Sequence, residues 1–317
     1  MKIAFFEVEK DKQAFFENVL PGVEVSFFEE RLDEKTVSLA KDADILCVFV
    51  TSLVNKNTID VMPNLKFIAT RTTGFNHIDC EYAKSKNIFV SNVPAYGSHT
   101  VAEFTFALLL TLSRKMREAG QAIKENGDFS IPKTVQGFDL DSKTIGVVGT
   151  GKIGKNVIQI ARGFNMNVLA YDLHPDLDFA TKNNFSYKTL PEVLSQSDIV
   201  TLHAPYTKEN HHLINKENIS QFKKGAYLIN TARGELVDTG ALTFALEEGI
   251  IAGAGLDVLE EEKSFIKGGV IPLLEMPNVI MTPHTAFNTK EAEFRIAETT
   301  IENIKSFISG TPINLVQ

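Results

Sequence analysis

The chain has few cysteines and no long hydrophobic run, and both scarcities limit what the protein can be. Only Cys47 and Cys80 occur among 317 residues, and neither has a second cysteine or a histidine at the spacing of a metal site. Two ordinary thiols are typical of a reducing compartment, so we expect a cytoplasmic protein. The most apolar stretch, residues 101–112, contains Glu103 and is far shorter than the roughly 20 residues of a membrane helix. We expect no membrane partner.

Positive charge is also scarce. The chain has 32 Lys and Arg against 40 Asp and Glu, a net charge of −8, and no cluster of basic residues. Binding to nucleic-acid phosphates requires such a cluster, so we expect no nucleic-acid partner. The length exceeds the roughly 250–300 residues at which one hydrophobic core stops growing, which predicts two domains.

Two series of short apolar segments alternate with helical patterns. The first predicts strands at residues 3–6, 23–28, 45–50, 67–69 and 88–90. The second predicts strands at residues 144–148, 168–171, 199–202, 226–229, 253–258 and 279–281. Such alternation is typical of α/β folds in which parallel strands are joined by crossover helices, so we predict two doubly wound parallel sheets.

Two long helices are predicted beside these sheets. One runs from near Thr100 to about Gly120, and it is apolar nearly all round over residues 101–112. The other follows a capping sequence at residues 288–291, and no strand comes after it in which the second sheet could continue. We therefore expect it to return to the first domain. The predicted domains are residues 1–98 with 287–317, and residues 99–286.

A glycine-rich segment follows the strand at residues 144–148 directly. Gly149, Gly151 and Gly154 stand in a G-x-G-x-x-G pattern that opens a helix. The first two glycines allow a tight turn and close approach to a pyrophosphate, and the third lets helix and strand pack closely. Strand, loop and helix together predict a dinucleotide site, which also includes Lys152 and Ile153.

Asp172 ends the next strand, near the roughly 20-residue spacing at which a carboxylate binds the ribose hydroxyls. The same charge repels a 2′-phosphate, and the following residues 173–175 offer no Arg or Lys to neutralise one. The predicted cofactor is therefore NAD rather than NADP. Thr231, Ala232, His203 and Pro205 follow later strands and are counted among the cofactor-binding residues.

Three residues suited to hydride-transfer chemistry on a 2-hydroxy or 2-oxo acid follow other strands of the second series. Arg233 can hold a carboxylate through its bidentate fork. His284 can exchange a proton at the reacting oxygen, because histidine titrates near neutral pH. Glu262, if close, favours the imidazolium and fixes its ring. The alternatives are a surface salt bridge for Arg233, a buried core histidine for His284 and a solvated acid for Glu262.

The sequence assigns the roles of other polar residues less specifically. Asp257 ends a strand and either accepts a hydrogen bond from the nicotinamide carboxamide or caps a loop. His203 either touches the cofactor or packs in the core. His211 and His212 are adjacent in a polar stretch without other metal ligands nearby in the sequence, which favours a surface turn. We predict no metal site.

Taken together, these segments resemble the D-2-hydroxyacid dehydrogenase family over nearly the whole chain. The resemblance rests on the glycine loop and on residues 73–79, 92–96, 101–103, 230–234, 256–258 and 283–284. It implies a Rossmann NAD-binding domain inserted in a smaller flavodoxin-like substrate domain. It also implies the catalytic set Arg233, Glu262 and His284, with Thr73 and Gly74 holding the substrate carboxylate. A homodimer joined through the NAD-binding domains is expected.

Within the family, residues 94–96 and 283–287 look like the D-lactate dehydrogenase branch, which implies pyruvate and D-lactate as substrates. Tyr96 and Phe287 would shape a small apolar pocket for the methyl group. The rivals are enzymes for a branched 2-oxo acid, hydroxypyruvate or glyoxylate, since one methylene gives only about 1–3 kcal/mol of discrimination. A nucleotide-sensing binding protein on the same fold is a further alternative, because fold alone does not determine function.

Overall fold

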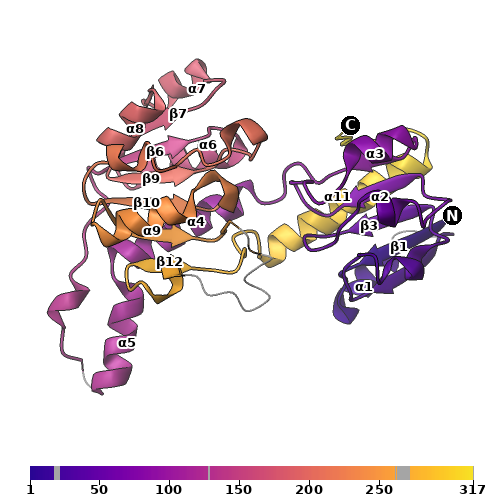
Figure 1. The fold of residues 1–317 in the computed structure, drawn as a ribbon, viewed down its shortest axis with the longest axis horizontal. Coiled ribbons are helices and arrows are strands. Elements are labelled where there is room, and N and C mark those ends of the chain that lie inside the picture. The colour runs from indigo at the N-terminus through magenta and orange to yellow at the C-terminus, as the bar shows by residue number, and fades with distance from the viewer. Residues whose placement is uncertain (18–21, 128, 261, 263–271, 317) are drawn as a thin grey trace. The chain divides into compact units, whose positions relative to one another are not determined.

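A computed structural model describes residues 1–17, 22–127, 129–260, 262 and 272–316. The chain forms two compact units, Met1–Tyr96 with Thr289–Gln317 (unit 1) and Gly97–Asn288 (unit 2). Each unit is built on its own parallel sheet, and unit 2 is inserted in the chain of unit 1 (Figure 1). The predicted fold class, two parallel-sheet α/β domains with one inserted in the other, is confirmed.

Unit 1 has the strand order β2-β1-β3-β4-β5. The sheet is buried on both faces, since residues 45–48 of β3 are all buried. One face packs a core that includes Phe6 and Leu46, and the other packs Phe5 and Ile45 against the last helix. Its elements are β1 (Lys2–Phe6), α1 (Lys10–Glu17), β2 (Glu24–Phe28), η1 (Val37–Ala40), β3 (Ile45–Val48), α2 (Lys56–Ile59), β4 (Phe67–Thr70), α3 (Cys80–Ser85), β5 (Phe89–Ser91) and α11 (Lys290–Ile308).

Unit 2 has the strand order β12-β11-β10-β9-β6-β7-β8. Its elements are α4 (Ser98–Ser113), α5 (Met116–Asn126), η2 (Lys133–Val135), β6 (Thr144–Val148), α6 (Lys152–Gly163), β7 (Asn167–Tyr171), α7 (Leu177–Lys182), β8 (Ser186–Tyr187), α8 (Leu190–Gln196), β9 (Ile199–Leu202), η3 (Lys208–Asn210), η4 (Ile219–Gln221), β10 (Ala226–Asn230), η5 (Gly234–Leu236), α9 (Thr239–Glu247), β11 (Ile251–Leu256), η6 (Pro272–Glu275) and β12 (Val279–Met281). Within the described residues, no helix has the length and apolar character needed to cross a membrane.

The register of the unit 2 sheet aligns the carboxyl ends of its strands. Val148 at the end of β6 pairs with Tyr171 of β7 and Leu202 of β9. On the other side, Asn230 of β10 pairs with Leu256 of β11. Every loop that carries a predicted cofactor or catalytic residue of unit 2 therefore leaves the sheet at the same edge.

One predicted helix is wrong. The single helix expected from Thr100 to Gly120 is two helices, α4 and α5, because Lys115 adopts a left-handed backbone conformation (φ 51°). The carbonyl of Ser113, left free by the break, accepts a hydrogen bond from the backbone of Phe138 at 2.9 Å. Neither glycine nor proline marks this position, so the sequence pattern runs on through it.

Candidate active site

The glycine loop connects β6 to α6 and leaves little room for side chains. Gly149 has φ +92°, and a Cβ there would lie 2.5 Å from the backbone nitrogen of Ala204. A Cβ on Gly154 would collide with the carbonyl oxygen of Gly149. Gly151 is the N-cap residue of α6, so no side chain caps the first N–H groups of that helix. The loop is thus shaped for close approach of an anionic group, and it fits the diphosphate of a dinucleotide.

Asp172 follows β7 and is fixed against the glycine loop. Its Oδ2 accepts hydrogen bonds from the backbone nitrogen and the hydroxyl of Thr150, at 2.6 and 2.8 Å, and its Oδ1 accepts one from the backbone of His174 at 2.8 Å. Burial acts to raise the pKa of Asp172, but the hydrogen bonds from His174 and Thr150 outweigh it and the net pKa is lowered. An ionised, fixed carboxylate beside the loop suits ribose hydroxyls and opposes a 2′-phosphate.

The remaining predicted cofactor residues lie in loops of the same edge. His203 is buried; its Nε2 lies 2.9 Å from the Thr201 hydroxyl, and its Nδ1 has no hydrogen-bond partner among the described residues. Burial lowers the pKa of His203 to about 3, so the ring is neutral. Pro205 is exposed, and Thr231 is buried with its hydroxyl 3.0 Å from that of Thr105.

Arg233 is presented by a tight turn after β10. The side chain of Asn230 closes this turn: its amide nitrogen donates to the Arg233 carbonyl at 2.9 Å, and its oxygen accepts from the Ala232 backbone at 3.0 Å. A Cβ at Gly234 would collide with the backbone of Leu259, so the turn lies directly against the segment that leads to Glu262. The Asn230 amide is 1 % exposed. No role was predicted for Asn230 itself, although an amide at the end of an apolar strand is a signal that the sequence offers.

The guanidinium of Arg233 keeps most of its donor capacity. Its Nη1 donates to the Ala232 carbonyl at 2.6 Å, and in the described part of the chain no carboxylate lies within ion-pair distance of it. A guanidinium has five N–H donors. Within the described residues, Arg233 therefore does not form the surface salt bridge that was considered as an alternative.

Glu262 and His284 form a pair. Nδ1 of His284 lies 3.2 Å from Oε2 of Glu262, while Oε1 accepts a hydrogen bond from the backbone of Leu259 at 3.2 Å. Burial acts to raise the pKa of Glu262, but the hydrogen bond and charge of His284, the Leu259 N–H and the charge of Arg233 together lower it. Glu262 is accordingly an ionised carboxylate that faces one nitrogen of the imidazole, and the ring's other nitrogen points elsewhere.

Asp257 organises the loop that carries His284. It is 1 % exposed, and its Oδ1 accepts from the Thr282 hydroxyl at 2.6 Å and the Thr285 backbone at 2.8 Å. Its Oδ2 accepts from the Ala286 backbone at 2.8 Å. The loop holds His284 in a left-handed conformation with φ 52°. Of the two roles considered for Asp257, the described contacts are those of a loop cap.

The predicted substrate residues are divided between the units. Thr73 and Gly74 lie after β4 in unit 1, where the Thr73 hydroxyl donates to the Val93 carbonyl at 2.8 Å and the Thr73 carbonyl accepts from the side chain of Asn92 at 2.7 Å. Tyr96 is the last residue of the first segment of unit 1. Phe287 belongs to unit 2 and is half-buried.

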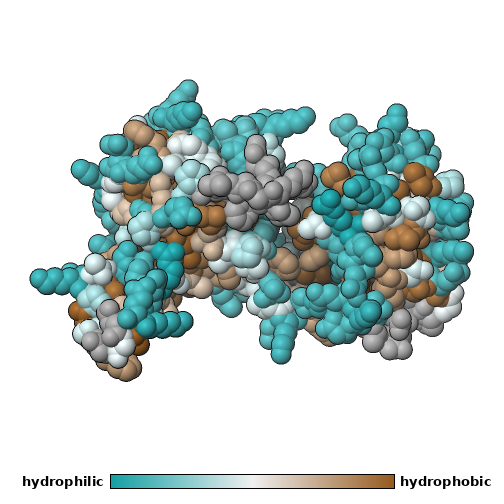
Figure 2. Space-filling model, turned by 60° about the horizontal axis from the view of Figure 1, so that its bottom comes forward, coloured by the Kyte–Doolittle hydropathy of each residue, from teal (hydrophilic) through white to brown (hydrophobic). Residues whose placement is uncertain are grey.

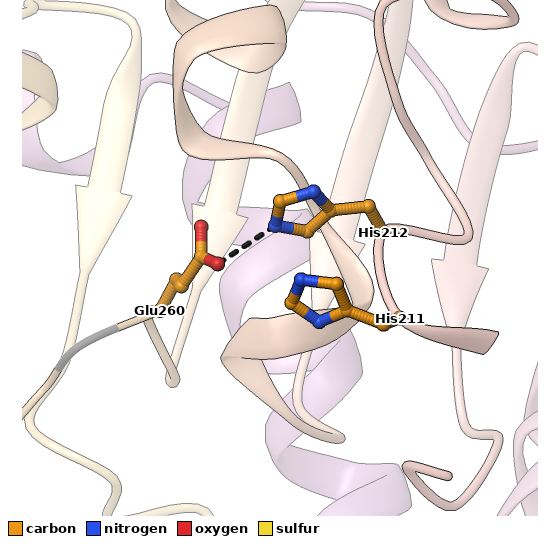
Figure 3. Close-up of side chains that lie close together, drawn as sticks. All are labelled: His211, His212 and Glu260. Atoms are coloured by element: carbon orange, nitrogen blue, oxygen red, sulfur yellow. Dashed lines mark hydrogen bonds and ion pairs between the residues drawn. The ribbon is translucent and has the colours of Figure 1, made fainter. Parts of the chain in front are cut away.

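The surface turn predicted at His211 and His212 is present. A third possible metal ligand lies beside it, since Oε1 of Glu260 is 2.7 Å from Nε2 of His212 (Figure 3). The partner stands far along the chain, so local spacing could not reveal it.

Comparisons with known proteins agree with this geometry. The family model of the NAD-binding domain of D-isomer specific 2-hydroxyacid dehydrogenases matches residues 106–286. A 2-hydroxyacid dehydrogenase homolog of Zymomonas mobilis is 39 % identical over 98 % of each chain. A glyoxylate reductase of Thermofilum pendens is 40 % identical over 87 % of this chain and 82 % of its own. The crystal structure of D-lactate dehydrogenase from Aquifex aeolicus, complexed with NAD and lactic acid, superposes with a TM-score of 0.87 at 38 % identity, covering 98 % of this chain and 96 % of that one.

These matches cover both sheets and the loops between their strands. They confirm the predicted family, the enzyme class and the NAD cofactor. The chain belongs to the D-isomer-specific 2-hydroxyacid dehydrogenase family, as an NAD-dependent oxidoreductase.

Proposed function

We propose that the protein reduces pyruvate to D-lactate with NADH and catalyses the reverse reaction, with Arg233, Glu262 and His284 as its catalytic residues. The observation that carries the proposal is the grouping of an ionised carboxylate, an imidazole 3.2 Å from it and a guanidinium whose charge acts on the same carboxylate. A 2-oxo acid needs one cation for its carboxylate and one proton donor for its carbonyl, and this cluster offers both.

Arg233 binds the substrate carboxylate in this proposal. Its fork makes two parallel charge-assisted hydrogen bonds, and a third N–H polarises the neighbouring carbonyl. The turn closed by Asn230 keeps the arginine backbone in place. Preorganisation of this kind spares the enzyme the entropy of ordering the cation when the substrate arrives.

His284 moves the proton. Its Nδ1 faces Glu262, which leaves Nε2 to protonate the carbonyl oxygen in reduction and to accept the hydroxyl proton in oxidation. Glu262 stabilises the imidazolium and fixes the ring. When bound, NADH supplies the hydride for carbon 2 and NAD accepts it in the reverse direction. The glycine loop and Asp172 hold this cofactor, with His203, Pro205, Thr231, Ala232 and Asp257 in the adjoining loops.

Pyruvate is proposed because residues 94–96 and 283–287 resemble the D-lactate branch and because the Aquifex neighbour was solved with lactic acid. Tyr96 and Phe287 are the proposed pocket residues for the methyl group, and Thr73 and Gly74 the proposed second holders of the carboxylate. Glyoxylate is the second candidate, since the Thermofilum relative is a glyoxylate reductase.

The test is the loss of NADH absorbance with pyruvate, glyoxylate, hydroxypyruvate and a branched 2-oxo acid side by side. We expect the highest kcat/KM with pyruvate, D-lactate as product, and much weaker turnover with NADPH. A higher kcat/KM with glyoxylate would overturn the pyruvate proposal but not the enzyme class. No turnover with any of the four acids would favour the nucleotide-sensing alternative.

We further propose a homodimer joined through unit 2. Phe129 and Ile131, just after α5, are 88 % and 87 % exposed. Figure 1 shows α5 extending away from the sheet of its own unit, and Figure 2 shows hydrophobic atoms reaching the surface of this extension. Apolar side chains gathered at such a position favour a protein interface. Sedimentation should give twice the chain mass, and Phe129→Ser with Ile131→Ser should give the monomer.

A cytoplasmic location is proposed as well. Cys47 and Cys80 are free thiols in the structure, and Cys47 is buried. Burial raises the pKa of the Cys47 thiol to about 12, so it is unreactive. Cell fractionation tests this proposal, which fails if the protein is recovered outside the cytoplasmic fraction.

A further inference from the structure

A second cluster of metal-binding side chains lies outside the candidate active site. His211, His212 and Glu260 each offer one ligand atom, and these three atoms lie within 4.8 Å of one another. The two imidazole rings are stacked, with centroids 3.8 Å apart and planes 24° from parallel. In Figure 3 the Glu260 carboxylate faces both rings, and its bond to Nε2 of His212 spans 2.7 Å.

The backbone fixes this arrangement. Successive side chains in extended chain point to opposite sides, but His212 adopts a left-handed conformation with φ 52°, and the two rings come to lie on one side. The turn is held by two hydrogen bonds: the His212 nitrogen donates to the Glu235 carbonyl at 2.9 Å, and the His212 carbonyl accepts from the Asn215 side chain at 3.0 Å. A non-glycine residue in this conformation is uncommon and is often found at functional sites.

The cluster is accessible to an ion from solvent. His211 is exposed, and the side chains of His212 and Glu260 retain 30 % and 25 % of their accessible surface. Two imidazoles and one carboxylate are the ligand set that zinc accepts with a water molecule in the fourth position. Magnesium and calcium prefer oxygen ligands, and imidazole favours zinc, copper and nickel.

We propose that His211, His212 and Glu260 bind one divalent first-row transition-metal ion, and that Zn²⁺ is the preferred one. Zn–N and Zn–O bonds of about 2.0–2.2 Å at tetrahedral angles put ligand atoms roughly 3.3 Å apart. The His212–Glu260 pair, at 2.7 Å, therefore needs to open by only about half an ångström, and ligand atoms that lie as far as 4.8 Å apart need to close by up to about 1.5 Å. The hydrogen bond between His212 and Glu260 is replaced by two metal–ligand bonds, and its proton is released to solvent, because both ligand atoms bind the ion in their deprotonated form.

The ion would connect two segments that matter for the candidate active site. Glu260 precedes Glu262 by two residues, and the His212 backbone is bonded to Glu235, which follows Arg233 by two residues. A bound ion ties the turn after β10 and the segment after β11 to the same point. It acts as a clamp on the protein, and none of its three ligands belongs to the proposed catalytic set. The proposal therefore does not depend on which 2-oxo acid is the substrate.

The experiment is calorimetric titration of the full-length chain, free of any polyhistidine tag, with Zn²⁺ and with Mg²⁺. We expect one Zn²⁺ per chain, a higher Tm in its presence, and no heat with Mg²⁺. His211→Gln and Glu260→Gln should each weaken Zn²⁺ binding more than about tenfold. Removing a residue that only hydrogen-bonds to a metal ligand already costs about 10–100-fold in affinity, and removing the ligand itself should cost more.

His99→Gln is the matched control. His99 is an exposed histidine of the same unit, and this variant has as many histidines as His211→Gln. It should bind Zn²⁺ as the parent does. Unchanged affinity in His211→Gln would overturn the proposal, as would loss of the single site in His284→Gln, which would place the ion at the candidate active site. Because His211 is exposed, its substitution is not expected to affect folding, and an unchanged circular dichroism spectrum checks this.

Discussion

Both sheets have carboxylates bonded to backbone N–H groups at their carboxyl ends, but in unit 2 a guanidinium and an imidazole stand there as well with hydrogen-bonding positions left over. In unit 1, the Glu7 carboxylate after β1 accepts hydrogen bonds from Phe49, Thr51 and Ser52. Arg71, after β4, is buried and donates to the carbonyls of Phe6 and Glu7, both at 2.7 Å. In unit 2, the corresponding edge holds Arg233, bonded only to its neighbour's carbonyl among the described contacts, and the Glu262–His284 pair.

At the same topological position, a structural charge and a functional one differ in what their hydrogen-bonding groups contact. Glu7 accepts hydrogen bonds from the backbone and hydroxyls of the segment after β3, and Nη2 of Arg71 donates to two backbone carbonyls, although its buried Nε has no partner among the described residues. Both residues therefore hold segments of unit 1 together. Arg233 and His284 are themselves held by neighbours, Asn230 and Asp257, and keep donors free for a ligand. Removing a residue of the first kind should affect stability, and removing one of the second kind should affect turnover.

The largest effect is expected from His284→Ala. Loss of the general acid and base should lower kcat by about 10²–10⁴, while the Tm stays near that of the parent because His284 contributes a partly exposed side chain. Steady-state kinetics in both directions and a thermal melt measure the two quantities. A kcat within error of the parent would remove His284 from the chemistry.

Arg233→Ala should come next. Truncating one partner of a hydrogen-bonded charge pair typically costs about 2–5 kcal/mol, so kcat/KM for the 2-oxo acid should fall between roughly 30-fold and several thousandfold. NADH binding, followed by fluorescence titration, should remain nearly intact, because the glycine loop and Asp172 stand on other strands. Equal losses in cofactor and substrate binding would show that the substitution disturbs the whole edge of the sheet.

The fold could be predicted from the sequence because periodic apolar segments and a glycine loop are local signals. Sequence reasoning placed Arg233, Glu262 and His284 on one edge because parallel strands end together, and the structure puts Glu262 within 3.2 Å of His284. It missed β8, a two-residue strand at the sheet edge, and the helix break at Lys115, which no glycine or proline announces. It also missed the pairing of His212 with Glu260, because contacts between distant segments depend on loop conformations that no local pattern encodes.

Glu7→Gln tests the structural side of the comparison. The substitution keeps the shape but turns an NH₂ group toward backbone N–H donors, so several hydrogen bonds to a charged acceptor are lost or weakened. We expect the free energy of unfolding to fall by roughly 2–3 kcal/mol. Urea unfolding measures it, and the kcat of the folded enzyme should change little.

Glu9→Gln and Glu262→Gln are the matched controls for Glu7. Glu9 is exposed and its substitution should leave both stability and turnover near the parent values. Glu262→Gln should reduce turnover while lowering the free energy of unfolding less than Glu7→Gln does, because Glu262 accepts fewer hydrogen bonds. If Glu7→Gln proved as stable as Glu9→Gln, the hydrogen bonds to Glu7 would not stabilise unit 1, and the structural role assigned to Glu7 would be wrong.

The smallest effect concerns His203, a buried residue at the carboxyl edge of the unit 2 sheet. Burial lowers the pKa of His203 to about 3 in the folded chain, against about 6.5 when unfolded. Below pH 6.5 the unfolded chain therefore takes up a proton that the folded chain does not, and stability falls as the pH falls. The expected loss is about 2 kcal/mol between pH 7 and pH 5.

Urea unfolding of the parent and of His203→Asn at both pH values measures this loss. The carboxylates of Asp172 and Glu262, whose pKa values are lowered on folding, lose their contribution to stability only at more acidic pH, as they become protonated. The other histidines are the same in both proteins, so the difference between parent and variant from pH 7 to pH 5 reports on His203. The variant should be less sensitive to pH in this interval, whatever its stability at pH 7. If the free energy of unfolding changed equally with pH in both proteins, His203 would take up a proton in the folded state as it does in the unfolded one. His203 would then be an accessible imidazole at the edge of unit 2 and not a buried neutral one.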